Sequence, residues 1–203
     1  MSDHCCPTPE TGIGDASYRK TLWIVLLINA AMFIAEVIAG LAAGSVSLQA
    51  DALDFLGDAA NYGISLYVIG KSLRVRANSA LIKSVSMLVF GLWVLGQALY
   101  KIITGTLPEA EVMGVIGFIA LAANLFSFYL LSRHSREDSN RQSAWLCTRN
   151  DAIGNIAVLF AAGAVYFTQS HWPDLLVALI MAYLAISSAW QITRKALTER
   201  AER

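Results

Sequence analysis

Apolar residues gather in six long blocks along the chain, separated by short polar connections. The blocks run at about 21–43, 46–70, 79–103, 110–132, 144–168 and 173–193. Each is close to the roughly 20 residues that an α-helix needs to cross a bilayer. Backbone groups in lipid must bond within their own segment, and the blocks lack the alternation of transmembrane strands. We therefore predict an all-α polytopic membrane protein, a bundle of six transmembrane helices.

Composition agrees with this pattern and narrows the possible partners. Hydrophobic residues make up 56% of the 203-residue chain, above the roughly 45–50% of soluble domains. The net charge is zero, so nothing points to nucleic acid. The three cysteines do not form a disulfide framework. The pattern predicts a polar tail over 1–20, a transmembrane domain over 21–193 and a short tail over 194–203.

The basic residues lie on alternate connections. They precede the first block, follow the second, separate the fourth and fifth, and follow the sixth: Arg19, Lys20, Lys71, Arg74, Arg76, Arg133, Arg136, Arg141, Arg194, Lys195, Arg200 and Arg203. The other connections, GLAAGSVS, TGTLPEAE and QSHWPD, contain no Lys or Arg. The positive-inside rule therefore predicts that both termini are cytoplasmic.

Three aspartates interrupt the second block, in the stretch SLQADALDFLGDAANY. On a helix, Asp51, Asp54 and Asp58 fall within about 60° of one another. An acid at the bilayer centre costs about 2.5–3.5 kcal/mol, and the apolar run of this block contains no Lys or Arg. The stripe must therefore face the bundle interior, water or a cation. The alternative is that these acids cap the helix or hydrogen-bond to Ser and Asn neighbours; capping concerns Asp51 above all, because acids suit a helix N-terminus.

The fifth block offers a matching pair four residues apart. In LCTRNDAIGN, Cys147 and Asp151 repeat the spacing of Asp54 and Asp58, and Asn155 shares their face, within about 80°. Asn150 is a further candidate ligand. Three carboxylates and a thiolate suit a transition metal such as zinc. The alternative for Cys147 is that it is a small apolar filler.

At these residues the sequence resembles the cation diffusion facilitator (cation efflux) family. SLQADALDFLGDAANY resembles the motif of that family's second helix, and CTRNDAIGN resembles the motif of its fifth. Carried over residue by residue, the resemblance implies a metal site of Asp54, Asp58 and Asp151, with Cys147 where the family usually has His. It covers about residues 20–195.

Three departures from the family pattern affect what is expected. Cys147 replaces the usual His, so metal preference is not simply inherited. About ten residues follow the last block, so we expect a short form without the family's cytoplasmic C-terminal domain. The connection KSLRVRANSALIKS contains no His, Asp or Glu, so the family's accessory loop site is not expected.

The resemblance implies a multi-pass exporter of divalent transition metal, Zn²⁺ or Cd²⁺, in the bacterial inner membrane. It also implies metal/proton antiport by alternating access and a homodimer. Such a protein is not an enzyme and needs no cofactor beyond its metal cargo. The alternatives are a proton-coupled exporter of small organic cations and a membrane metal sensor or chaperone that transports nothing.

The N-terminal tail contains DHCC, with His4, Cys5 and Cys6 on the predicted cytoplasmic side. These side chains either capture soft metal ions or are incidental to a disordered tail. In the first block, Asn29 and Glu36 are seven residues apart and therefore share a face. They either line a pathway or bond to another helix.

Overall fold

The computed structural model describes the backbone of residues 16–67, 73–132 and 139–201. Within these ranges it describes the side chains except at 16–18, 65, 73–77, 139–150, 195 and 198–201. The described backbone forms helices and no strands, which confirms the predicted fold class. The helices are α1 (Ala16–Ala42), α2 (Val46–Tyr67), α3 (Leu73–Thr104), α4 (Ala110–Ser132), α5 (Ser139–Thr168) and α6 (Trp172–Ala201).

Four helices extend beyond their apolar blocks at the same end of the bundle. α1, α3 and α5 begin about five residues early, and α6 ends about eight residues late. The connection KSLRVRANSALIKS is therefore mostly helical, because α3 begins at Leu73. These extensions are polar but contain Ala, Lys and Arg, which are good helix formers. The apolar pattern thus located the spans, while intrahelical hydrogen bonding decided where the helices end.

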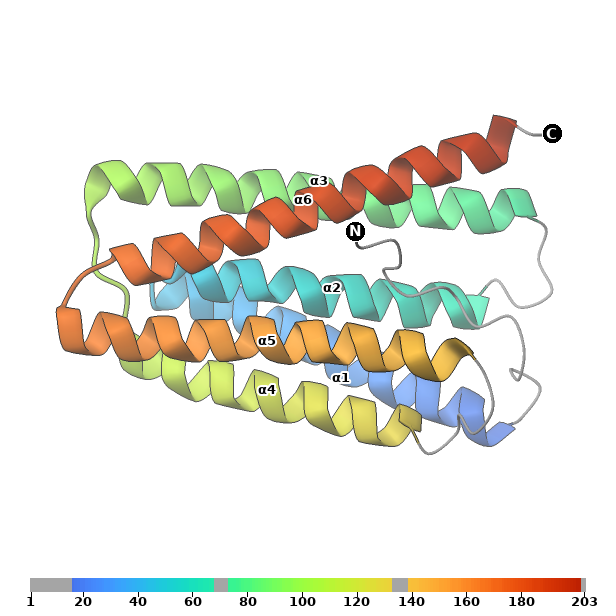
Figure 1. Ribbon diagram of the computed structural model, residues 1–203, viewed down its shortest axis with the longest axis horizontal. Coiled ribbons are helices and arrows are strands. Elements are labelled where there is room, and N and C mark those ends of the chain that lie inside the picture. The colour runs from blue at the N-terminus through green and yellow to red at the C-terminus, as the bar shows by residue number, and fades with distance from the viewer. Residues whose placement is uncertain (1–15, 68–72, 133–138, 202–203) are drawn as a thin grey trace.

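Helix α2 lies at the centre of the bundle and contacts all five other helices. Its most extensive packing is against α1, while α3 packs mainly on α6 and α4 on α5. Figure 1 shows α3 and α6 together above α2, with α4 and α5 below it. The acids of α2 are therefore carried by the helix with the most neighbours.

The connections α1–α2, α3–α4 and α5–α6 gather at one end of the bundle (Figure 1). The Glu109 N–H donates to the Ala43 carbonyl at 2.9 Å, which joins the first two of these connections. Gly44 and Gly105 adopt φ angles of 65° and 63°, a conformation that other residues rarely adopt. These glycines let the chain reverse directly after α1 and after α3.

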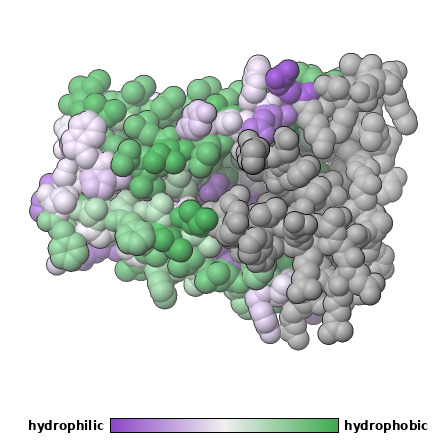
Figure 2. Space-filling view, viewed as in Figure 1, coloured by the Kyte–Doolittle hydropathy of each residue, from purple (hydrophilic) through white to green (hydrophobic). Residues whose placement is uncertain are grey.

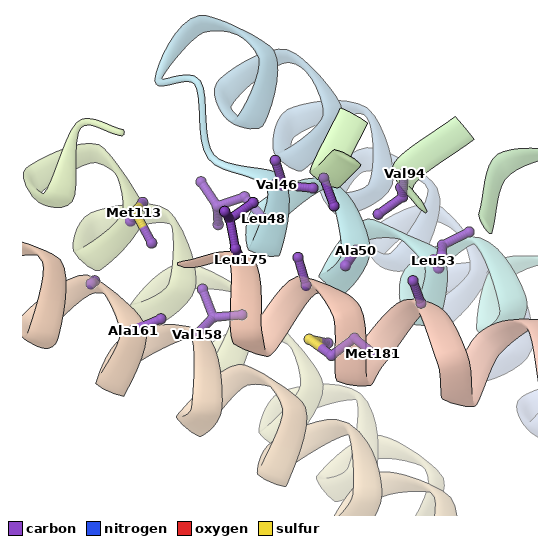
Figure 3. Close-up of a cluster of buried hydrophobic side chains, with 14 of the residues drawn as sticks. Val46, Leu48, Ala50, Leu53, Val94, Met113, Val158, Ala161, Leu175 and Met181 are labelled. Atoms are coloured by element: carbon purple, nitrogen blue, oxygen red, sulfur yellow. The ribbon is translucent and has the colours of Figure 1, made fainter. Parts of the chain in front are cut away.

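The main core surrounds the first half of α2 (Figure 3). Leu48 and Leu53 are fully buried there, together with Val94 from α3, Val158 from α5 and Leu175 from α6. Small side chains such as Ala50, Ala161 and Ala178 share this cluster, so the helices approach closely. This packing holds α2 against α5, where the predicted site lies.

The outer surface of the described residues is largely apolar, as lipid contact requires. Over the described residues visible in Figure 2, hydrophobic side chains cover most of the face. Long apolar side chains such as Ile103, Phe160 and Phe167 are more than 70% exposed. Within the described ranges, α1, α3, α4, α5 and α6 each contain a stretch long and apolar enough to cross a membrane. α2 does not, because its 22 residues include three aspartates.

The N-terminus of α2 is capped by an acid from α6. Asp174 accepts hydrogen bonds from the Ser45 hydroxyl at 2.7 Å, the Val46 N–H at 2.9 Å and the Ser47 N–H at 3.0 Å. Ser45 in turn accepts from the Leu48 N–H at 3.2 Å. The first N–H groups of a helix have no partner within it, and here Ser45 and Asp174 supply one. The alternative that Asp51 caps this helix is therefore wrong.

Candidate metal centre

Two of the three aspartates of α2, Asp51 and Asp54, lie close to the backbone of α5. Asp51 is fully buried, whereas Asp54 and Asp58 are partly exposed. Gly154 of α5 lies against Asp51 and Asp54. A Cβ atom placed on Gly154 would lie 3.4 Å from Asp54 Oδ2 and 3.6 Å from Asp51 Oδ1. Because Gly154 has no side chain, the two carboxylates can approach the backbone of α5.

Asn155, next to Gly154, binds the innermost of these acids. Its Nδ2 donates to Asp51 Oδ1 at 3.1 Å, and both residues have no exposed surface. The contact joins positions 104 residues apart in the chain. The sequence had identified both residues as candidates on separate segments, and the structure brings them together.

Glu36 from α1 completes a buried group with Asp51. The two carboxyl groups face each other within hydrogen-bonding range, and neither side chain has exposed surface. When both are ionised, Glu36 Oε1, Glu36 Oε2 and Asp51 Oδ2 have no donor among the described residues. A hydrogen bond between two carboxyl groups requires a proton on one of them. This group therefore needs a proton or another cation to be stable in the bundle interior.

Asn29, the other polar residue on this face of α1, behaves differently. Its Nδ2 donates to the carbonyl of Val25 in the same helix at 2.8 Å. Glu36 reaches another helix, which is one of the two interpretations the sequence left open for the pair. Asn29 satisfies one of its two polar atoms locally, and Asn29 Oδ1 has no partner within the described part of the chain.

Asp58, nearer the other end of α2, has a cationic neighbour that the sequence reasoning missed. Lys83 of α3 interacts electrostatically with Asp58 and donates a hydrogen bond from Nζ to Asn61 Oδ1. Lys83 is partly buried. The apolar run of α2 contains no basic residue, as the sequence showed, but the neighbouring helix supplies one. The signal was available, because Lys83 is a lysine inside the apolar block at 79–103.

The remaining predicted ligands are only partly covered by the structure. Asp151 is partly exposed and lies one helical turn before Asn155 on α5. The side chains of Cys147 and Asn150 lie outside the described residues, as do His4, Cys5 and Cys6 entirely. Among the described side chains, no three His, Cys, Asp or Glu residues lie close enough together to hold a metal ion. The four-ligand set therefore stays a prediction.

Comparison with known proteins gives matches over most of this chain. A family model described as the cation efflux transmembrane domain matches residues 22–199. The zinc transporter ZitB of Escherichia coli K12 is 26% identical over 201 residues, covering 93% of this chain and 64% of ZitB. The metal cation efflux system protein CzcD of Cupriavidus metallidurans is 25% identical over 191 residues, covering 88% of this chain and 60% of CzcD.

A more distant relative is named for several metals. The cadmium, cobalt and zinc/H(+)-K(+) antiporter of Bacillus velezensis is 22% identical over 197 residues, covering 89% of this chain and 62% of the antiporter. The chain thus spans about 60–64% of the length of these curated relatives. The match begins at the start of the first span and ends beyond the sixth, so it includes every helix that forms the acidic centre. This chain belongs to the cation efflux transmembrane domain family.

Proposed function

We propose that this protein exports a divalent transition metal, Zn²⁺ or Cd²⁺, across the membrane in which its helices lie. The observation that carries the proposal is the set of carboxylates on α2 that approach α5 at Gly154 and Asn155. Asp51 Oδ2 and both carboxylate oxygens of the neighbouring Glu36 have no donor among the described residues. Buried anions of this kind are stable only beside a cation or when protonated. A transported metal ion and a returning proton meet that requirement in turn.

The proposed ligands are Asp54 and Asp58 of α2 with Cys147 and Asp151 of α5. Asp51, Asn150 and Asn155 are proposed as outer partners, and Asp51 and Asn155 already bond to each other. Carboxylate and thiolate ligands together favour Zn²⁺ or Cd²⁺ over Mg²⁺ and Ca²⁺. His4, Cys5 and Cys6 are proposed to capture metal before it enters.

The proposed cycle is metal/proton antiport by alternating access. Metal binds the deprotonated ligands, so protons compete with it for the same groups. Because α2 contacts every other helix, a change in its packing against α5 can alter which end of the bundle is open to the centre. Protons arriving from outside would displace the metal outward and then return to the cytoplasm. We also propose that both termini are cytoplasmic and that the chain acts as a homodimer in the inner membrane.

Transport by the purified protein in proteoliposomes tests this function. Wild type should carry Zn²⁺ or Cd²⁺ down an imposed gradient, with proton movement in the opposite direction detected by a pH-sensitive dye. Asp54→Ala and Asp151→Ala should lower metal affinity by at least about 100-fold, because each removes a charged ligand. Glu111→Ala is the matched control, since Glu111 is an exposed acid of α4, and it should transport normally.

Other outcomes would identify other functions. Transport of small organic cations without metal transport would contradict metal export. It would support a proton-coupled exporter of small organic cations instead. Metal binding by the wild type with no uptake under any gradient would indicate a sensor or chaperone. Normal transport by Asp54→Ala and Asp151→Ala would remove both residues from the ligand set.

A further inference from the structure

Lys83 of α3 lies beside the proposed metal ligands. Its Nζ donates to Asn61 Oδ1 on α2 and interacts electrostatically with Asp58, one turn before Asn61. Ile82 and Val85 beside it in sequence are 70% and 53% exposed, as expected for lipid-facing positions. Lys83 itself is partly buried. A lysine inside an apolar helix is costly unless it has a partner in the bundle, and two partners of Lys83, Asn61 and Asp58, are on α2.

The arrangement allows the ammonium group to serve two positions. Asn61 accepts the hydrogen bond through a neutral oxygen, so this contact does not neutralise the ammonium charge that acts on Asp58. The flexible four-carbon stem of lysine lets Nζ shift by several ångströms without movement of the backbone. Asp58 and Asn61 are three residues apart on one helix face and therefore within this reach. Lys83 can thus approach Asp58 or withdraw toward Asn61.

We propose that Lys83 is a tethered counter-cation that competes with the transported metal at Asp58. With no metal bound, its charge neutralises Asp58; when metal arrives, the ammonium withdraws to Asn61 and repels the ion from there. Its effect is to weaken metal binding and speed metal release, so that the ion is not held too tightly for transport. The proposal deepens the proposed function and rests on Asp58 being a metal ligand.

A second lysine of α3, Lys101, provides a matched control. Lys101 is 8% exposed and interacts electrostatically with Asp174, at the end of the bundle where Asp174 caps α2. Both lysines come from the same helix and face an aspartate of another helix. Only Lys83 faces a proposed metal ligand. A variant at Lys101 therefore reports the general cost of removing a buried lysine from α3.

The test measures Cd²⁺ affinity by isothermal titration calorimetry on the full chain in detergent, with turnover measured in proteoliposomes. Lys83→Met should bind Cd²⁺ about tenfold more tightly, because a positive charge near the ion is lost. Its maximal transport rate should fall, because release becomes slower. Lys83→Arg keeps the charge and should stay within about twofold of wild-type affinity. Lys101→Met should leave Cd²⁺ affinity unchanged.

Substitution of Asn61 should change Cd²⁺ affinity in the opposite direction, and it leaves both Lys83 and Asp58 in place. Asn61→Leu removes the oxygen that holds the ammonium away from Asp58, so it should weaken Cd²⁺ binding severalfold. This variant also decides the matter if Lys83→Met does not fold.

Unchanged or weaker Cd²⁺ binding by a folded Lys83→Met overturns the proposal, as does an Asn61→Leu variant that binds as well as wild type. If Asp58→Asn still lowers Cd²⁺ affinity in those cases, the role of Lys83 is rejected and the proposed metal export is retained. Failure of wild type to bind Zn²⁺ or Cd²⁺ at all overturns both.

Discussion

Two fully buried acids beside α2, Asp174 and Glu36, differ in how their carboxylates are satisfied. Asp174 has no exposed surface and accepts three hydrogen bonds, from Ser45 and from the first two residues of α2. Glu36 also has no exposed surface, yet neither of its oxygens has a donor among the described residues. It faces another acid, Asp51, whereas Asp174 has the charge of Lys101 nearby.

The comparison distinguishes Asp174, an acid that stabilises the fold, from Glu36 and Asp51, which need a proton or a metal ion to neutralise them. An ionised carboxylate that receives two or three N–H or O–H donors replaces the water it has lost. A carboxylate facing another carboxylate gains no such replacement, and repulsion adds to the cost. A stable fold keeps such a group only where a proton or a metal ion neutralises it. Burial alone therefore does not distinguish the two roles, but the donor set does.

The largest expected effect is on stability at Asp174. Asp174→Ala should lower the free energy of unfolding by about 3 kcal/mol, because the Ser45 hydroxyl and two N–H groups lose their acceptor in a buried place. SDS titration of the protein in mixed micelles measures this change. Glu111→Ala is the control: an exposed acid in the first turn of α4 should cost under about 0.5 kcal/mol. Equal losses of unfolding free energy in the two variants would contradict the structural role of Asp174.

A smaller effect is expected at Cys147. Its substitution tests whether a thiolate joins the acids as a metal ligand. Cys147→Ser should weaken Cd²⁺ binding about tenfold and Zn²⁺ binding less, because a hydroxyl is a harder and poorer ligand than a thiolate. Cys147→His should shift the preference toward Zn²⁺. The double variant Cys5→Ser, Cys6→Ser is the matched control and should change affinity only modestly. Unchanged Cd²⁺ and Zn²⁺ dissociation constants in Cys147→Ser would make this cysteine a packing residue.

The smallest expected effect has the opposite sign to that at Asp174. Glu36→Gln replaces one of two facing carboxyl groups with an amide of the same size, whose N–H₂ can donate to Asp51. The free energy of unfolding should rise by about 1 kcal/mol, because one unsatisfied buried acid is removed. The same SDS titration measures it, with Glu36→Ala as the comparison that leaves a cavity. A loss of stability in Glu36→Gln would show that Glu36 is satisfied in the native protein and would break the contrast with Asp174.

Much of the architecture was predictable from the order of residues. The six blocks correspond to the six helices of the described chain, because apolar length and internal hydrogen bonding leave a segment in lipid few alternatives. The acidic face of α2 also followed from the helical repeat, and the matched spacing on the fifth block suggested a partner helix that the structure places beside Asp51 and Asp54. The metal preference stays a prediction, since it depends on Cys147, whose side chain lies outside the described residues.

The partners of the acids were decided by the tertiary structure. Asp174 caps a helix 128 residues away, Asn155 bonds an aspartate 104 residues away, and Lys83 reaches Asn61 on the neighbouring helix. The hydrophobic pattern shows which face of a helix is buried, but not which helix lies against it or at what height. Those choices depend on the packing of α2 among five neighbours. The sequence by itself thus determined that three acids enter the bundle. Only the packing decided which buried acids have hydrogen-bond donors, which acid faces a lysine, and which acids need a cation to neutralise them.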